Sequence, residues 1–380
     1  GWGAAAYAQV DGLAAFAKYI GAYGVGALAA FVAACLASAW SGFRRDPLAR
    51  GQLKRLAPVA LVGLLAAVAG HEFSAPAGSL DVALLQGNIK QSEKFEAGTG
   101  IADALKWYGE QIRAQKASLI VAPETAIPVL PQQLPDDYWQ TLVKPFVAGD
   151  AAGAGAGKQA LLFGIPLGSY RDGYTNSVMG FKPLGGSKQA LLGESYRYDK
   201  HHLVPFGEFI PPLFKWFTRM MNIPLGDFNR GPLGQPSLPV AGERVAPNIC
   251  YEDLYGEELA SRFADAALAP TVFANVSNLG WFNDSIALDQ HLNISRARAL
   301  EFQRPFVRAT NTGATAILDH QAVVQKELPR LTRGVLVGEV QGRTGVTPFA
   351  WWAARWGLWP LWAVCLLLIA GAWRLGRSQR

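Results

Sequence analysis

The sequence predicts a layered α/β domain enclosed between membrane-spanning helices. Short apolar runs alternate with amphipathic stretches between residues 74 and 349, which is typical of strands interleaved with helices. Long apolar segments rich in tryptophan lie towards both ends of the chain. Half of the residues are hydrophobic, which is high for a soluble protein and low for a bundle made of membrane helices alone.

Three segments have the apolar character needed to cross a bilayer, which takes roughly 20 residues. They are 19–40, 56–73 and 356–373. The middle segment is the shortest, and a buried helix of a soluble protein is its alternative interpretation. The segments divide the chain into a membrane part over 1–73, a catalytic domain over 74–349, and a C-terminal helix with a basic tail over 350–380.

The net charge of +6 is concentrated beside these segments. The loop 41–55 carries +4 and the tail 374–380 carries +3. The positive-inside rule places both on the cytoplasmic side, so the domain between them is expected on the other side, the periplasm of a bacterium. We therefore predict a multi-pass protein of the inner membrane. The rest of the chain has no excess of basic residues, which argues against nucleic-acid binding.

The elements of the domain follow from the hydrophobic pattern. Helices are predicted at 101–116 and 294–302, and strands at 81–88, 119–122, 160–164, 244–249, 271–276, 306–310 and 314–319. The segment 148–158 is rich in glycine and superficially suggests a phosphate loop. Ala152 occupies the first glycine position and Gln159 replaces the Ser or Thr, so a surface loop is predicted instead.

Three reactive side chains stand at the end of an apolar run or beside one: Glu124, Lys200 and Cys250. Cys250 follows a predicted strand and precedes a helix-like stretch, and such a turn exposes a nucleophile. Its thiol needs a base, because a free thiol has a pKa of about 8.5. Glu124 can accept that proton, and Lys200 can stabilise both the thiolate and a developing oxyanion. The alternatives are a helix cap for Glu124 and a solvated loop residue for Lys200.

No metal site and no cofactor is predicted. His201 and His202 are adjacent, so their side chains point apart, and no further ligand set completes a site. His291 is expected to be a structural hydrogen-bonding residue rather than a base. Cys35 and Cys365 lie inside apolar segments, so no disulfide partner is predicted for Cys250.

An apolar segment at 209–228 contains Phe214 and Trp216. A soluble enzyme rarely exposes so much apolar surface in one loop. We interpret it as a lid that dips into the outer leaflet and shapes a lipid-accessible pocket, with core packing against a sheet as the alternative.

Together these motifs resemble the carbon–nitrogen hydrolase, or nitrilase, superfamily, and most closely its membrane-bound branch, the apolipoprotein N-acyltransferases. The resemblance covers nearly the whole chain. The matching segments are 23–26, 86–89, 123–126, 200–208, 250–252, 275–278, 290–301, 308–311 and 345–348.

The resemblance implies a nitrilase-like αββα sandwich inserted between transmembrane helices. It implies that Glu124 is the general base, Lys200 the oxyanion and thiolate stabiliser, Cys250 the acylated nucleophile and Glu208 a second essential carboxylate. Tyr251 and Glu252 would shape the nucleophile turn. The residues expected to contact substrate are Phe95, Tyr251, Glu252, Trp281, Phe214 and Trp216.

The implied reaction moves an acyl chain from a phospholipid, through a cysteine thioester, to the N-terminal amine of a diacylglyceryl-modified apolipoprotein. A membrane-bound amidase of the conjugal-transfer type is the alternative. A non-enzymatic assembly factor is disfavoured, because a scaffold does not need all three triad residues. The chain also departs from the family pattern in three places. It has fewer membrane helices, so we expect an N-terminal truncation; Phe95 stands where Trp is usual; and 278–282 lacks an acidic residue.

Overall fold

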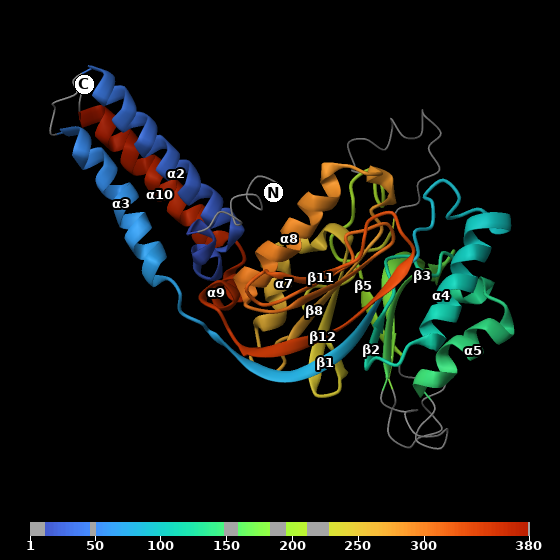
Figure 1. Cartoon of the computed structure of the whole chain (residues 1–380). Helices are drawn as coiled ribbons and strands as arrows, with labels where there is room; N and C mark the ends of the chain where they lie inside the picture. The colour runs from blue at the N-terminus through green and yellow to red at the C-terminus, as the bar shows by residue number, and fades with distance from the viewer. Residues whose placement is uncertain (1–11, 46–50, 148–158, 183–194, 211–227, 379–380) are drawn as a thin grey trace, which may run out of the picture.

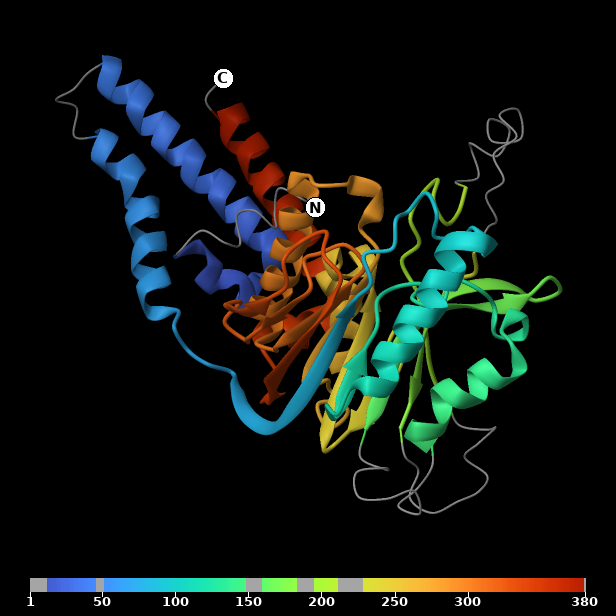
Figure 2. The same ribbon diagram turned by 45° about the vertical axis from the view of Figure 1, so that its right-hand side comes forward.

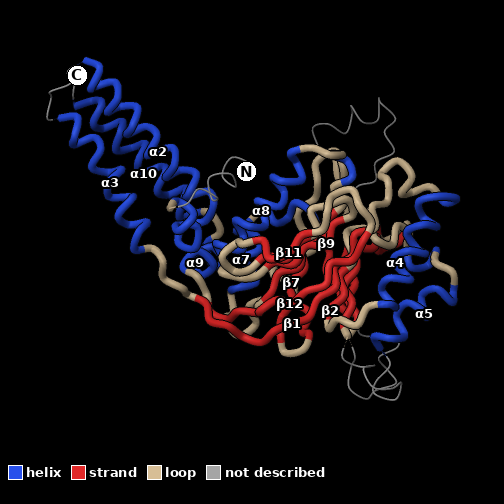
Figure 3. Tube along the Cα trace, in the orientation of Figure 1, coloured by secondary structure: helices blue, strands red, loops and turns tan. Residues whose placement is uncertain are grey.

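The computed structural model describes residues 12–45, 51–147, 159–182, 195–210 and 228–378, and two six-stranded sheets form its centre (Figure 1). Figure 3 shows the strands of both sheets stacked between helices. The first sheet has the order β12 (Gly334–Gly345), β1 (Ser74–Gln86), β2 (Leu119–Val121), β3 (Ala160–Ser169), β4 (Gly173–Phe181) and β5 (Tyr196–Asp199). The second has the order β11 (Val324–Glu327), β10 (Ala316–Leu318), β9 (Phe306–Thr310), β8 (Val272–Ser277), β7 (Glu243–Ile249) and β6 (Leu238–Val240).

Each sheet is mixed, with three parallel strands at its centre. Strands β1, β2 and β3 run parallel in the first sheet, and β7, β8 and β9 run parallel in the second. Antiparallel strands pair at both flanks of each parallel set. The carboxyl ends of parallel strands therefore gather at one edge of each sheet, which is where α/β proteins place their functional loops.

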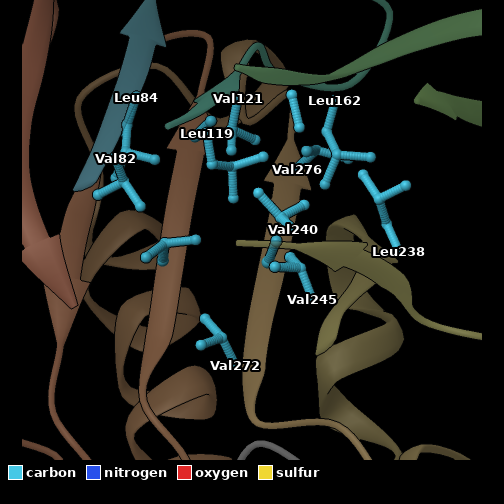
Figure 4. Packing of buried hydrophobic residues seen from close by; sticks show 14 of the residues in the cluster. Val82, Leu84, Leu119, Val121, Leu162, Leu238, Val240, Val245, Val272 and Val276 are labelled. Atoms are coloured by element: carbon cyan, nitrogen blue, oxygen red, sulfur yellow. The ribbon is translucent and has the colours of Figure 1, made fainter. Parts of the chain in front are cut away.

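The two sheets pack face to face through aliphatic side chains. Figure 4 shows Val82, Leu84 and Val121 of the first sheet near Val276 and Val240 of the second. Successive residues of a strand point to opposite faces, so Ala83 and Leu85 face the other way, into the cluster that packs beneath helices. Because both faces of the strands are covered, their sequences read as continuous apolar runs.

Helices cover the outer face of each sheet. Helices α4 (Ala102–Ala114) and α5 (Asp136–Val147) pack on the first sheet, with Tyr108, Ile112 and Phe146 buried there. Helices α7 (Gly256–Ala260), α8 (Ile286–Phe302) and α9 (Pro348–Trp356) pack on the second. The expected layered α/β sandwich is thus confirmed.

Several elements differ from the sequence-based expectation. Strands β4, β5, β6, β11 and β12 and helices α5 and α7 were not predicted. Helix α8 begins at Ile286 rather than at 294, and Ser285 caps it by accepting a hydrogen bond from the Ala287 N–H. Polar residues such as His291, Ser295 and Arg298 are buried on α8, so its apolar face is interrupted. Because of that interruption, the hydrophobic pattern did not reveal the first turns of α8.

Three apolar helices extend from the same side of the sandwich: α2 (Ala17–Arg45), α3 (Gly51–Val68) and α10 (Trp359–Ser378) (Figures 1 and 2). Among the described residues, one helix, Leu13–Arg44, is by itself long and apolar enough to cross a membrane. Pro348–Trp356 and Trp359–Arg374 form a pair bent by 90°, which would count as a second span if taken together.

The helix over the predicted span at 56–73 ends before the span does. It begins at Gly51 and ends at Val68, and its stretch Leu56–Ala66 is apolar, while passage of this helix through a bilayer stays a prediction. The residues that follow lead directly into β1 at Ser74. An apolar run in the sequence does not show where helix gives way to a connecting segment.

Helix α2 is fixed to the sandwich at a kink. Gly21 has a φ of +68°, and a Cβ there would come within 2.4 Å of the Phe349 ring. Opening the helix at this point frees the Ala22 N–H, which donates to the buried Glu301 carboxylate of α8. The Trp352 indole N–H of α9 donates to the Tyr19 carbonyl at 2.8 Å. These contacts join the apolar helix α2 to the sandwich.

Candidate active site

The candidate catalytic residues lie in loops at the carboxyl ends of strands from both sheets. Glu124 follows β2, and Lys200 directly follows β5. Cys250 opens a 3₁₀ turn, η7 (Cys250–Leu254), directly after β7. The two sheets meet at this edge, because the backbone N–H of Asn278, after β8, donates to Glu124 Oε2 at 2.9 Å.

The nucleophile turn has strained backbone geometry. Cys250 has a φ of +55°, a conformation that costs a non-glycine residue on the order of 1–3 kcal/mol and persists where surrounding contacts enforce it. The Asn275 side chain of β8 enforces it here by donating to the Cys250 carbonyl at 2.8 Å. The thiol is free and partly buried. This is the strand-to-helix turn that the sequence predicts for a nucleophile.

A buried ion cluster joins three of the predicted residues. The Lys200 ammonium is only 1% exposed and lies 3.3 Å from Glu124 Oε1 and 2.9 Å from Glu208 Oε1. The Asn176 side chain of β4 donates to the same two oxygens, at 2.7 Å and 2.6 Å. Glu208 Oε2 accepts from the Val204 N–H at 2.8 Å. Buried charges are retained only when they are paired and hydrogen-bonded in this way.

These contacts set the protonation states of the resting site. Burial raises the pKa of the Cys250 thiol well above its ordinary value, and the nearby Glu124 carboxylate raises it further. Burial would also raise the pKa of Glu124, but Lys200 and Asn176 outweigh it and hold that pKa low. Burial opposes the charge of Lys200, yet Glu124 and Glu208 raise its pKa. The resting arrangement is therefore a thiol beside a carboxylate base and an ammonium.

Glu252 ties the lysine loop to the nucleophile turn. Its Oε1 accepts from the backbone N–H groups of His201 and His202, at 2.6 Å and 3.1 Å. Its Oε2 accepts from the Ile249 N–H at 2.7 Å and the Tyr198 hydroxyl at 2.8 Å. One buried carboxylate thus sets the position of Lys200 relative to Cys250. Contact between Glu252 and substrate stays a prediction.

Tyr251 and His291 are each held by a polar contact. The Tyr251 hydroxyl donates to the Leu203 carbonyl at 2.7 Å, and the Lys200 ammonium lies 5.7 Å from its ring centre. His291 is buried and lies beside the Arg308 guanidinium, with 2.8 Å between Nδ1 and Nη2. Burial lowers the pKa of His291, so it is a neutral packing residue.

Within the described ranges, no group of three or more His, Cys, Asp or Glu residues could hold a metal ion.

The predicted substrate contacts lie around this site or outside the described residues. Phe95 and Trp281 are 58% and 71% exposed, each a few residues from a group that bonds to Glu124. Phe214 and Trp216 fall in 211–227, outside the described residues.

Sequence reasoning missed Asn176 and Lys94, which bond to Glu124. Neither stands in a motif, and an asparagine within a strand or a lysine in a loop carries no signal of its own.

Comparison with known proteins identifies the domain and its relatives. The profile of the carbon–nitrogen hydrolase family matches residues 81–349. A protein of Verminephrobacter eiseniae named apolipoprotein N-acyltransferase is 53% identical over 94% of this chain and 67% of its own length. One of the same name from Ralstonia nicotianae is 47% identical over 92% of this chain and 63% of its own. The chain thus spans about two thirds of the length of these curated relatives.

Among solved structures, the fold resembles a CN-hydrolase superfamily protein of Xanthomonas campestris. The two chains are 18% identical, with a TM-score of 0.48 over 74% of this chain and 96% of the other.

Proposed function

Because this chain belongs to the carbon–nitrogen hydrolase family, as one of its apolipoprotein N-acyltransferases, we propose that it acylates lipoproteins through a thioester on Cys250. The acyl donor is a phospholipid, and the acceptor is the N-terminal amine of a diacylglyceryl-modified cysteine. The observation that carries the proposal is the buried pairing of Glu124 and Lys200 next to a cysteine in a strained turn.

In the first half-reaction, Glu124 takes the proton of the Cys250 thiol. The sulfur attacks the ester carbonyl carbon, a C–S bond forms, and the carbonyl oxygen becomes an oxyanion that the Lys200 ammonium stabilises. The bond between the carbonyl carbon and the glycerol oxygen then breaks. The leaving oxygen receives the proton from Glu124, so the products are a lysophospholipid and the acyl thioester.

In the second half-reaction, the acceptor amine attacks the thioester carbonyl. Glu124 takes a proton from the amine, an amide bond forms, and the C–S bond breaks. The proton returns from Glu124 to the sulfur, which restores the resting thiol. Glu208 keeps Lys200 in place through both steps, since its carboxylate lies 2.9 Å from the ammonium.

Exposed aromatic side chains around the site support a lipid substrate. Phe95 lies next to Lys94, which bonds to the Glu124 carbonyl, and Trp281 follows Asn278, which bonds to the Glu124 carboxylate. Phe206, 48% exposed, stands between Lys200 and Glu208 in the sequence. Apolar rings left in contact with solvent beside a polar catalytic cluster are suited to packing against acyl chains.

A transfer assay separates this function from that of an amidase. The purified protein, in vesicles of phosphatidylethanolamine with a labelled acyl chain, is given a synthetic diacylglyceryl peptide with a free N-terminal amine. We expect N-acylated peptide and lysophospholipid in equal amounts, measured by mass spectrometry. A matched peptide with an acetylated amine should accept nothing. Release of free fatty acid with no peptide product would overturn the transferase proposal.

We also propose that residues 74–349 form the periplasmic domain of a multi-pass inner-membrane protein. The support is the placement of basic residues at 41–55 and 374–380, with α2, α3 and α10 extending from one side of the sandwich. Reporter fusions after Arg55 and after Arg380 should indicate the cytoplasm, and a fusion at Gly155 the periplasm. A cytoplasmic signal at Gly155 would contradict this topology.

A further inference from the structure

Lys94 is a second buried lysine at the active site, and the mechanism above does not use it. Its side chain is 2% exposed, although it lies in the loop that follows β1. Its ammonium donates to the backbone carbonyl of Glu124 at 3.1 Å. A buried lysine is rare unless it is paired, because removing an ammonium from water is costly.

The fold holds this lysine in place from two sides. A Cβ on Gly100 would come within 2.0 Å of the Glu93 carbonyl oxygen and 2.8 Å of the Lys94 Cα, so the helical turn η2 (Ala97–Ile101) packs directly on the lysine backbone. On the other side, Gln91 accepts a hydrogen bond from the Asn278 side chain at 2.7 Å. Asn278 also bonds to Glu124, so the lysine loop and the base share an anchor.

Lys94 adds a second positive charge to the buried cluster of Glu124, Glu208 and Lys200. Glu124 and Glu208 carry two negative charges, and Lys200 supplies one positive charge. Lys94 supplies the second. The Asp253 and Arg308 pair beneath the turn is balanced by itself, with 3.1 Å between Oδ2 and Nη1. A net negative charge in this pocket would oppose formation of a thiolate or an oxyanion at Cys250.

We propose that Lys94 is a positioning residue for acylation, which fixes the backbone of Glu124 and supplies the second positive charge of the pocket. When the thiol proton moves to Glu124, negative charge moves towards Cys250. Lys94 interacts electrostatically with both of these groups, so it stabilises the charge before and after the transfer. This inference rests on the proposed function in that Cys250 is the acylated residue.

The protonation of Lys94 fits this role at neutral pH. Burial lowers the pKa of its ammonium to about 8, while Glu124 and Cys250 oppose that shift. The ammonium is therefore mostly charged at pH 7 and loses its charge as the pH rises through about 8.

Thiol alkylation tests the inference without a lipid substrate. In a C35S/C365S background, the rate of iodoacetamide alkylation of Cys250 is measured from pH 6 to 10 in wild type and in Lys94→Met. Met keeps the length of the side chain and removes its charge. We expect alkylation at pH 7 to slow about tenfold. The difference between the two proteins should shrink as the pH rises through about 8, because the wild type then loses the charge of Lys94. Single-turnover acylation should fall by a similar factor.

Three further variants separate charge from structure. Lys94→Gln retains a donor for the Glu124 carbonyl without the charge, so it should behave like Lys94→Met. Lys94→Arg retains the charge and should recover much of the wild-type alkylation rate at pH 7. Lys90→Met removes an exposed lysine of the same loop and should change nothing. Thermal unfolding confirms that each variant is folded.

A wild-type alkylation profile in folded Lys94→Met or Lys94→Gln would overturn the inference. So would equal losses in the Arg, Gln and Met variants that stay the same from pH 6 to 10, because that pattern indicates packing rather than charge. The alkylation results could hold while neither the wild type nor any variant forms an acyl adduct from phospholipid. In that case the proposed function fails, and the role of Lys94 in thiol activation stands.

Discussion

Glu124→Gln should abolish acylation of Cys250 on the timescale of the wild-type reaction. Glutamine keeps the shape of the side chain, and its single oxygen can still accept from either the Asn278 N–H or Asn176, but it cannot take the thiol proton. Because burial keeps the Cys250 thiol protonated, no other route to the thiolate is favourable at neutral pH. Loss of a general base costs on the order of 10²–10⁴-fold in rate. The measurement is the single-turnover rate of thioester appearance by intact-protein mass.

The matched control is Glu110→Gln, which changes an exposed glutamate of α4 and should leave the rate unchanged. Transfer should fail together with acylation in Glu124→Gln, because the same carboxylate takes the proton of the incoming amine. Near-wild-type acylation in Glu124→Gln would exclude this residue as the base and would require a different proton acceptor near Cys250.

Lys200→Arg should lower the acylation rate by on the order of 10²-fold or more, the cost of losing one well-placed oxyanion donor. The positive charge remains, so Glu124 and Glu208 still have a partner. A planar guanidinium, however, does not fit where one small ammonium lies between two carboxylates at 3.3 Å and 2.9 Å. Lys106→Arg, at an exposed position of α4, is the matched control.

The two half-reactions should respond alike to Lys200→Arg, since each passes through an oxyanion on the same carbonyl. Single-turnover acylation and the decay of a preformed thioester in the presence of acceptor amine measure them separately. Full activity in a folded Lys200→Arg variant would show that the charge alone is needed, and would assign the oxyanion contact to another donor.

The candidate triad of Glu124, Lys200 and Cys250 could be picked out from the sequence because each member stands in a short motif beside an apolar run. What the sequence does not show is how these motifs are held together. Asn176 joins Glu124 to Glu208 from the middle of β4, and Glu252 joins the lysine loop to the nucleophile turn. Both roles arise from tertiary contacts between segments that are far apart in the chain. Asn176 leaves no local pattern, whereas Glu252 stands in the motif 250–252, which does not show its contact with the lysine loop.

The fold, like the site, could be predicted from the sequence only in part. The central strands were predictable, because a strand covered on both faces is a continuous apolar run bounded by turns. The flanking strands β5 and β12 mix polar and apolar residues, and β5 has only four residues. Hydropathy located the apolar helices but not their bounds, since the helix over the second predicted span ends at Val68 and Pro348–Trp356 is bent by 90° from Trp359–Arg374. Apolar composition alone does not fix where a helix bends or ends.

The most direct test of the central claim is the mass of the intact protein after incubation with phospholipid and no acceptor. The mechanism predicts an added mass equal to one acyl chain, located on Cys250 by peptide mapping and released by neutral hydroxylamine, as a thioester is. Cys250→Ser should carry no such hydroxylamine-labile adduct, while C35S/C365S should carry the full amount. The same labile adduct on Cys250→Ser, or on any residue other than Cys250 in wild type, would contradict the account.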